Sequence, residues 1–72
     1  HVYYFRSSVG VFRIFPANGV FLLDVDMVMF NSYLTPEEAV MDVYMHATGY
    51  DEWDKLKGVE EAPAELSGWV YL

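Results

Sequence analysis

"VFRIFPANGVFLLDVD", residues 11–26, contains two runs of strand-forming residues on either side of a short turn sequence. Val11–Phe15 and Val20–Asp26 are rich in Val, Phe and Ile, which are enriched in β-strands. Between them, Asn18 and Gly19 readily adopt the positive φ angles that a tight hairpin turn requires. The segment therefore predicts an antiparallel hairpin, to which the other elements are expected to add.

One further strand is expected before this hairpin and another after it. Val2–Arg6 is rich in Tyr, Val and Phe and precedes a turn sequence that contains Ser and Gly. Met27–Tyr33 continues as a strand after a turn near residues 26–28, whose Met and Val residues do not favour turn formation. We therefore predict a small antiparallel sheet of three to four strands.

One helix follows, with clear start and stop signals in LTPEEAVMDVYMHATG, residues 34–49. Thr35 is the expected N-cap, Pro36 occupies the first helical position, and Glu38 completes a T-x-x-E capping box. Gly49 is the expected C-terminal stop. The predicted buried stripe consists of Ala39, Val43, His46 and Ala47, with Val40 and Tyr44 beside it and with Met41, Met45 and Thr48 pointing away.

The remaining residues are less regular. Tyr50–Leu56 is compatible with a short helical turn, in which Trp53 and Leu56 are expected to seal one edge of the core. Residues 63–72 predict another brief helical turn followed by an apolar end. Residues 1–72 thus predict a single compact domain of the α+β class, a small antiparallel sheet of three to four strands with one packed α-helix and an irregular C-terminal tail.

The composition limits the possible partners. Four basic and eleven acidic residues give a net charge of −7, which opposes binding to nucleic acid and to anionic membranes. No apolar run approaches the roughly 20 residues that a bilayer-spanning helix needs, so we expect a soluble protein. The absence of cysteine excludes disulfides and Cys-based zinc sites, and it fits a cytoplasmic location if the protein is natural. No cofactor or metal is expected.

Strand alternation divides the apolar residues between two faces of the sheet. Phe21, Leu23 and Val25 share one face, and Phe12 and Ile14 join them. A single helix can cover only one face of a small sheet. The other face keeps an apolar set that the helix cannot reach, which consists of Val11, Phe15, Val20, Leu22, Met27 and Met29. Either the C-terminal GWVYL segment folds back over this set, or the set binds a partner.

The segment DVDMVMFNSY, residues 24–33, favours the second alternative, because a protruding anchor needs apolar residues at a turn and a buried minor core does not. The chain is therefore predicted to be a non-catalytic protein-binding module. The expected contacts are Met27, Val28, Met29 and Phe30, with Met41 and Met45, or Trp69, Val70 and Tyr71, as a flank. Phe30 is equally compatible with the core, because alternation places it opposite Met29. The partner is another protein, or a second copy in a homodimer.

The segments GVFRIFP, GVFLLDVD, SYLTPEEAVMDVYMHATGYDEWDKL and APAELSGW resemble a group of short bacterial proteins of unknown function. The resemblance covers most of residues 9–69 and implies a small sheet, one helix and a Trp-containing tail, with no assigned activity. The chain departs from that pattern at residues 26–29 and 68–71, where apolar residues replace polar ones. Such changes are typical of a binding surface built on a scaffold, by selection or by engineering. An engineered binder on a bacterial scaffold and a natural protein that self-associates are the alternatives.

Catalysis is not predicted. Glu38, Asp42 and His46 follow one another at four-residue intervals, so a helix would align them for a divalent metal or a carboxylate–imidazole base. A solvated helix face with i,i+4 contacts explains the same spacing, and one His does not complete a zinc site. A minor enzyme or metal-binding domain that uses Asp42 and His46 is the least favoured alternative. If His46 borders an interface, its titration would make binding depend on pH.

Overall fold

The computed structural model describes residues 1–72 and has an α+β architecture, which confirms the predicted fold class. The elements, in chain order, are β1 (Tyr3–Ser7), β2 (Gly10–Ala17), β3 (Val20–Val25), β4 (Val28–Tyr33), α1 (Pro36–Tyr44), α2 (Asp51–Asp54), the 3-10 turn η1 (Leu66–Gly68) and β5 (Val70–Tyr71). The sheet has one strand more than expected, because the C-terminal residues join it.

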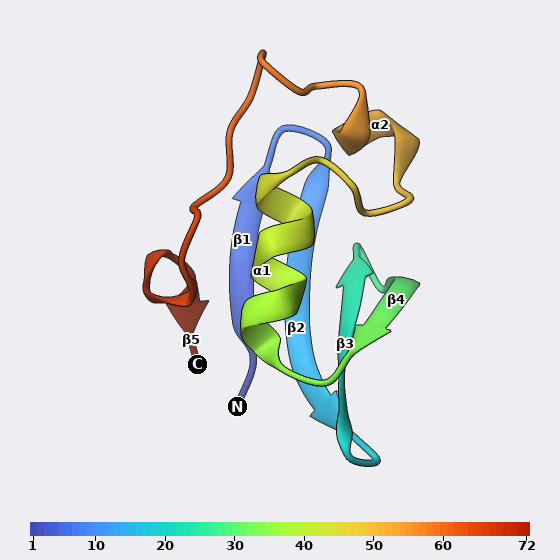
Figure 1. Ribbon diagram of the computed structural model, residues 1–72, viewed down its shortest axis with the longest axis vertical. Coiled ribbons are helices and arrows are strands. Elements are labelled where there is room, and N and C mark those ends of the chain that lie inside the picture. The colour runs from blue at the N-terminus through green and yellow to red at the C-terminus, as the bar shows by residue number, and fades with distance from the viewer.

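The strands form one antiparallel sheet in the order β4-β3-β2-β1-β5 (Figure 1). Strands β1, β2 and β3 each pair with the next strand along the chain. The C-terminal segment then returns to the far edge, where β5 pairs with β1. The backbones of Val2 and Leu72 exchange two hydrogen bonds of 2.7 and 2.9 Å, so the two termini lie side by side.

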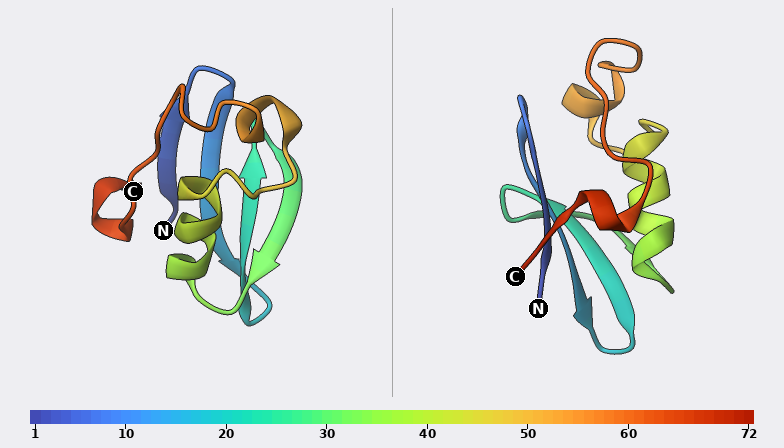
Figure 2. Two further views of the ribbon diagram at one scale, coloured as in Figure 1. Left: turned by 45° about the horizontal axis from the view of Figure 1, so that its top comes forward. Right: turned by 90° about the vertical axis from the view of Figure 1, so that its left-hand side faces the viewer.

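The helices lie on one side of the sheet, which we call the inner face (Figure 2). In the right-hand view α1 and α2 stand on this side, and the opposite outer face carries no further layer. The less favoured alternative, in which GWVYL folds over the outer face, is wrong, because this segment extends the sheet at its edge. Neither helix has the length or the hydropathy of a membrane-spanning segment.

The inner face holds the core, as strand alternation predicted. Register places Phe12 opposite Val25 and Ile14 opposite Leu23, and all four are buried. The turn that sets this register has the expected geometry, with φ angles of +52° at Asn18 and +83° at Gly19. The buried core residues are Phe12, Ile14, Leu23, Val25, Ala39, Val40, Val43, Trp53, Ala62 and Trp69.

Trp53 is the largest fully buried side chain of this core. Its ring packs edge-on against Phe5 and Phe12, and its indole N–H donates to the Val43 carbonyl over 2.9 Å. Leu56 packs against the same core from its edge, so the prediction for these two residues is confirmed. Trp53 thereby joins the short helix α2 both to the sheet and to α1.

Helix α1 begins as predicted. The Thr35 hydroxyl accepts a hydrogen bond from the Glu38 N–H, and the Glu38 carboxylate accepts one from the Thr35 N–H, which together form the capping box. Ala39, Val40 and Val43 face the sheet and are buried. The N-terminal half of the predicted stripe is therefore confirmed.

The end of α1 differs from the prediction, since the helix stops at Tyr44 and Gly49 is not its terminator. His46 adopts a φ of +55°, which a continuing helix cannot accommodate. Its ring stacks on Trp53 at a centroid distance of 4.4 Å, and its Nε2 lies 2.8 Å from the Glu60 carbonyl oxygen. These tertiary contacts hold His46 in the conformation that ends the helix.

The early end of α1 changes which residues are buried after it. Tyr44 and Ala47 are exposed and His46 is only half-buried, so the C-terminal half of the predicted stripe is wrong. Thr48 was expected to point away and is buried. Its hydroxyl donates to the Asp54 carboxylate over 2.8 Å, and its N–H donates to the same group. A buried hydroxyl needs such a partner, and α2 supplies it.

An ion pair occupies the centre of the outer face. Asp24 is only 2% exposed, and its carboxylate accepts hydrogen bonds from Nε and Nη2 of Arg13 on the neighbouring strand. The hydrogen bond to Asp24 raises the pKa of Arg13, and the guanidinium lies 4.8 Å above the Phe15 ring. The apolar outer residues around this pair are half-buried, namely Val11, Phe15, Val20 and Leu22.

Replacing Arg13 by Met is expected to lower the free energy of unfolding by roughly 3 kcal/mol, because the buried Asp24 carboxylate then lacks a counter-charge. Combining Arg13→Met with Asp24→Leu is expected to recover most of that loss, since two apolar side chains replace the pair. Urea unfolding at neutral pH measures both variants. A double variant no more stable than Arg13→Met would contradict this role of the ion pair.

Candidate functional site

The turn between β3 and β4 combines a tight backbone with a residue that does not favour it. Asp26 and Met27 have φ angles of +47° and +73°, close to the +52° and +83° of Asn18 and Gly19 at the other end of β3. Both turns therefore have the type I′ pattern of two positive φ angles. Asp tolerates this region, whereas the Cβ of Met27 costs roughly 1 kcal/mol relative to glycine. The turn is thus less stable with Met27 than it would be with glycine.

Three consecutive apolar side chains protrude from this turn. Met27 is 76% exposed, Val28 58% and Met29 49%. These side chains contribute little to the stability of the fold, because most of their apolar surface stays in water. We call residues Asp26–Met29 the apolar turn.

Asp26 fixes the apolar turn against the start of β2. Its Oδ1 accepts a hydrogen bond of 2.8 Å from the Val11 N–H, and its own N–H donates to the Val11 carbonyl over 3.0 Å. Gly10, with a φ of +137°, leaves room for this approach, since a Cβ there would lie 2.8 Å from Asp26 Oδ2. The turn is therefore held in one position, which reduces the entropy that it would lose on binding.

A shallow pocket of about 360 Å³ lies beside the apolar turn. Its apolar residues are Val25, Val28, Phe30 and Tyr50, and its acidic residues are Asp26, Asp51 and Glu52. The rings of Phe30 and Tyr50 lie 5.0 Å apart, and the Tyr50 hydroxyl donates to the Val9 carbonyl over 2.6 Å. Burial, followed by the charges of Glu52 and Asp26, raises the pKa of Tyr50. The pocket thus combines apolar walls with a negative electrostatic potential from its three carboxylates.

Phe30 belongs both to the core and to this pocket. Leu23 pairs with Asn31 and Asp24 pairs with Met29, so Phe30 is the extra residue of a β-bulge. Its side chain is half-buried and packs against the core while it also lines the pocket. The core packing of Phe30 is confirmed, and its role as a partner contact stays a prediction.

Strand β4 also forms one edge of the sheet and contains no charged residue. Edge strands commonly carry Lys or Pro, which discourage pairing with another chain. In β4 the Asn31 side chain accepts a hydrogen bond of 2.8 Å from the Ser32 N–H and so covers the edge at one point. No charged side chain of β4 protects this edge next to the apolar turn.

The predicted flanking residues do not gather around the apolar turn. Met41 is exposed on α1, and Met45 is exposed at the C-cap that follows it. Val70 and Tyr71 are exposed on β5, which lies at the opposite edge of the sheet from β4. Trp69 was expected at the surface, but it is only 5% exposed. The pairing of the C-terminal strand with β1 places the Trp69 ring against Phe5 and Phe12 of the core. Trp69 is therefore a core residue.

The predicted row of Glu38, Asp42 and His46 is not formed. Glu38 caps α1, and Asp42 accepts a hydrogen bond of 2.7 Å from the Tyr33 hydroxyl. Burial and this hydrogen bond raise the pKa of Tyr33. His46 lies beyond the end of the helix and faces the Glu60 carbonyl. No group of three or more His, Cys, Asp or Glu side chains is arranged to hold a metal ion.

Comparisons of the chain with protein families, with curated proteins and with solved structures gave no match. The resemblance to short bacterial proteins and the interpretation as an engineered scaffold therefore stay predictions. The function is inferred from the geometry and chemistry of the molecular surface.

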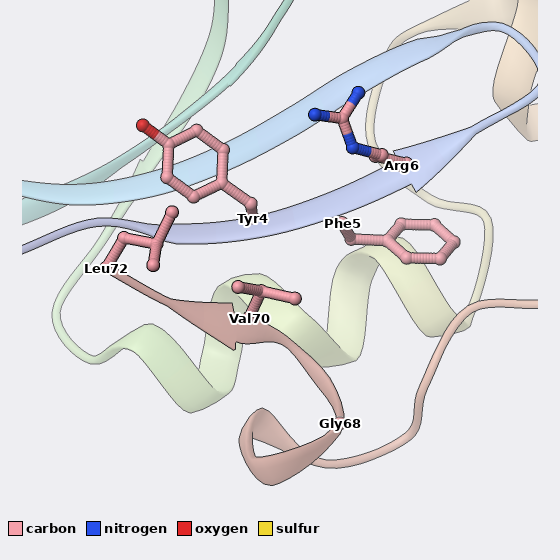
Figure 3. Close-up of a pocket in the computed structure, with 6 residues that line it drawn as sticks. All are labelled: Tyr4, Phe5, Arg6, Gly68, Val70 and Leu72. Carbon is pink, nitrogen blue, oxygen red and sulfur yellow. The ribbon is translucent and has the colours of Figure 1, made fainter.

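Two sets of surface residues were missed from the sequence. Tyr50, Asp51 and Glu52 approach the apolar turn only through the packing of α2, and the acidic run after Gly49 gave no sign of it. A groove at the opposite edge is lined by Tyr4, Phe5, Arg6, Gly68, Val70 and Leu72 (Figure 3). Its formation depends on the pairing of β5 with β1, which local sequence patterns do not encode.

Replacing Met27 by Gly is expected to raise the free energy of unfolding by roughly 1 kcal/mol, because glycine adopts a φ of +73° without strain. Gly19→Met is the mirror control, since a Cβ at Gly19 meets nothing within 4 Å and only the backbone cost remains. It is expected to lower stability by a similar amount. Thermal and urea unfolding measure both variants, and a Met27→Gly variant less stable than the wild type would refute the strain at this turn.

Proposed function

We propose that this protein is a non-catalytic protein-binding module whose contact surface is the apolar turn together with the adjoining pocket. The observation that carries the proposal is Met27, which stands at a positive φ and keeps 76% of its surface in solvent. Backbone strain at an exposed site points to a role outside the folded chain. A protruding apolar side chain on a fixed turn resembles the residues that contribute most of the binding energy at the centre of protein–protein interfaces.

The surroundings of the turn support a partner of defined character. Asp26, Asp51 and Glu52 surround an apolar pocket, and the chain as a whole carries a net charge of −7. A complementary surface would place apolar residues against Met27 and Met29 and basic residues against these carboxylates. The same charges oppose the approach of a second copy of the chain. A different protein with an apolar and basic contact segment is therefore the partner that we propose.

A homodimer is the second candidate, and the uncharged edge of β4 favours it. Two copies could align their β4 edges antiparallel about a twofold axis and extend the sheet from one molecule to the other. Sedimentation velocity over a range of concentrations separates the candidates. The proposed module is expected to sediment as a monomer of 8.3 kDa. A dimer that the Met29→Thr substitution dissociates would instead identify a second copy of the chain as the partner.

Selection of a displayed random peptide library on the immobilised chain tests the contact surface. We expect the enriched peptides to combine apolar and basic residues and to bind the Met27→Gly and Met29→Thr variants about tenfold or more weakly, the effect of losing about 1.4 kcal/mol of contact energy. Met41→Gln and Met45→Gln are the matched controls, because Met41 on α1 and Met45 at its C-cap are about as exposed as Met29.

The Met27→Gly variant separates loss of binding from loss of folding, since its stability is expected to rise while its affinity falls. Peptides that bind Met27→Gly and Met29→Thr as tightly as the wild type would contradict the proposed contact surface. The same conclusion would follow if Met41→Gln weakened binding as much as Met29→Thr.

A further inference from the structure

The edge of the sheet opposite the apolar turn contains a groove of about 460 Å³ between β1 and the C-terminal segment (Figure 3). Figure 3 shows the Tyr4 ring and the Arg6 guanidinium rising from the same side of β1, which follows from their spacing of two residues. Val70 and Leu72 come from the neighbouring β5 segment. The volume falls within the range of about 300–1,000 Å³ that is typical of small-molecule sites.

The backbone of Arg6 is open toward this groove. Val2 exchanges both of its backbone hydrogen bonds with Leu72, so the even-numbered residues of β1 direct their N–H and C=O groups to the β5 side. Strand β5 contains two residues, and its last pairing on this side is between Val70 and Tyr4. Arg6 follows Tyr4 with no strand beside it, which leaves a backbone donor and an acceptor at the end of the groove.

The Arg6 side chain is also without an ionic partner. The one ion pair of the structure joins Arg13 to Asp24, and no carboxylate oxygen lies within 4 Å of the Arg6 guanidinium. Lys55 and Lys57 also form no ion pair, but Arg6 is the basic residue that lines the groove. Arg6 therefore presents an available positive charge at an apolar groove.

The walls of the groove are apolar and open to solvent. Val70 is 57% exposed and Leu72 74%, and both lie beside the ring of Tyr4. A ligand that covers these side chains would gain the free energy of removing apolar surface from water. Its anionic group would meet the guanidinium and the free N–H of the same residue, which together provide charge-assisted hydrogen bonds.

We propose that this groove binds a small monocarboxylate with an aliphatic or aromatic body. The carboxylate is held by the guanidinium and the backbone N–H of Arg6, and the apolar body lies along Tyr4, Val70 and Leu72. A single guanidinium matches one negative charge, and the net charge of −7 disfavours ligands with several. This site lies at the other edge of the sheet from the apolar turn and does not depend on the proposed protein partner.

Titration of the isotope-labelled chain with sodium octanoate, followed by amide NMR, tests the site. We expect shifts concentrated at the amides of Arg6 and the groove residues, with a Kd on the order of 1 mM for a ligand of this size. Octylammonium has the same chain with the opposite charge and is expected to leave these signals unchanged. Arg6→Gln is expected to weaken octanoate binding about tenfold, and Val70→Thr to weaken it less.

Lys57→Gln is the matched control, because it removes an exposed cation that does not line the groove and is expected to leave the affinity unchanged. Thermal unfolding of each variant verifies that the fold is intact. Equal binding of octylammonium, unchanged octanoate affinity in Arg6→Gln, or shifts that are absent or lie outside the groove would each overturn the proposal.

Discussion

The helical layer covers only one face of a five-stranded sheet, and this constraint determines where the other apolar residues lie. Trp53 and Trp69 pack with α1 against the inner face and complete the core. On the outer face, the Arg13–Asp24 ion pair occupies the centre of a half-buried apolar surface. Two groups of exposed apolar residues lie at the sheet edges, one in the apolar turn and one in β5 and Leu72. The other large exposed apolar residues lie around the helices and loops, namely Leu34, Met41, Tyr44, Met45 and Val59.

The two ends of β3 show what distinguishes the apolar turn from an ordinary connection. Both turns have two positive φ angles, and one of them uses Asn18 and Gly19, which favour that geometry. The other uses Asp26, which tolerates it, and Met27, which does not. The chain therefore contains its own reference for an unstrained turn. The two turns differ in that the second carries a large apolar side chain directed into water. The proposed binding role explains why a residue that strains the backbone stands at this position.

The sequence predicted the features that depend on neighbouring residues. The β2–β3 hairpin, the Thr35 capping box and the buried face of β3 follow from turn chemistry and from periodicities of two and 3.6 residues. The exposure of the apolar turn followed from its composition. The predictions that were wrong concern features that depend on contacts between residues far apart in the sequence. His46 ends α1 because it packs on Trp53 and Glu60, and the tail becomes a strand because it meets β1. The burial of Trp69 and the Arg6 groove are consequences of that same pairing.

The central claim is that the Met27 side chain projects into solvent from a folded monomer. Solvent paramagnetic relaxation of the methionine methyl groups, measured by NMR on dilute protein, tests it most directly. The chain has four methionines, and Met41 and Met45, at 48% and 49% exposure, provide internal references. The account predicts that a soluble paramagnetic probe relaxes the Met27 methyl most strongly and the Met29 methyl about as strongly as the references. A Met27 methyl that is better protected than those of Met41 and Met45 would contradict it.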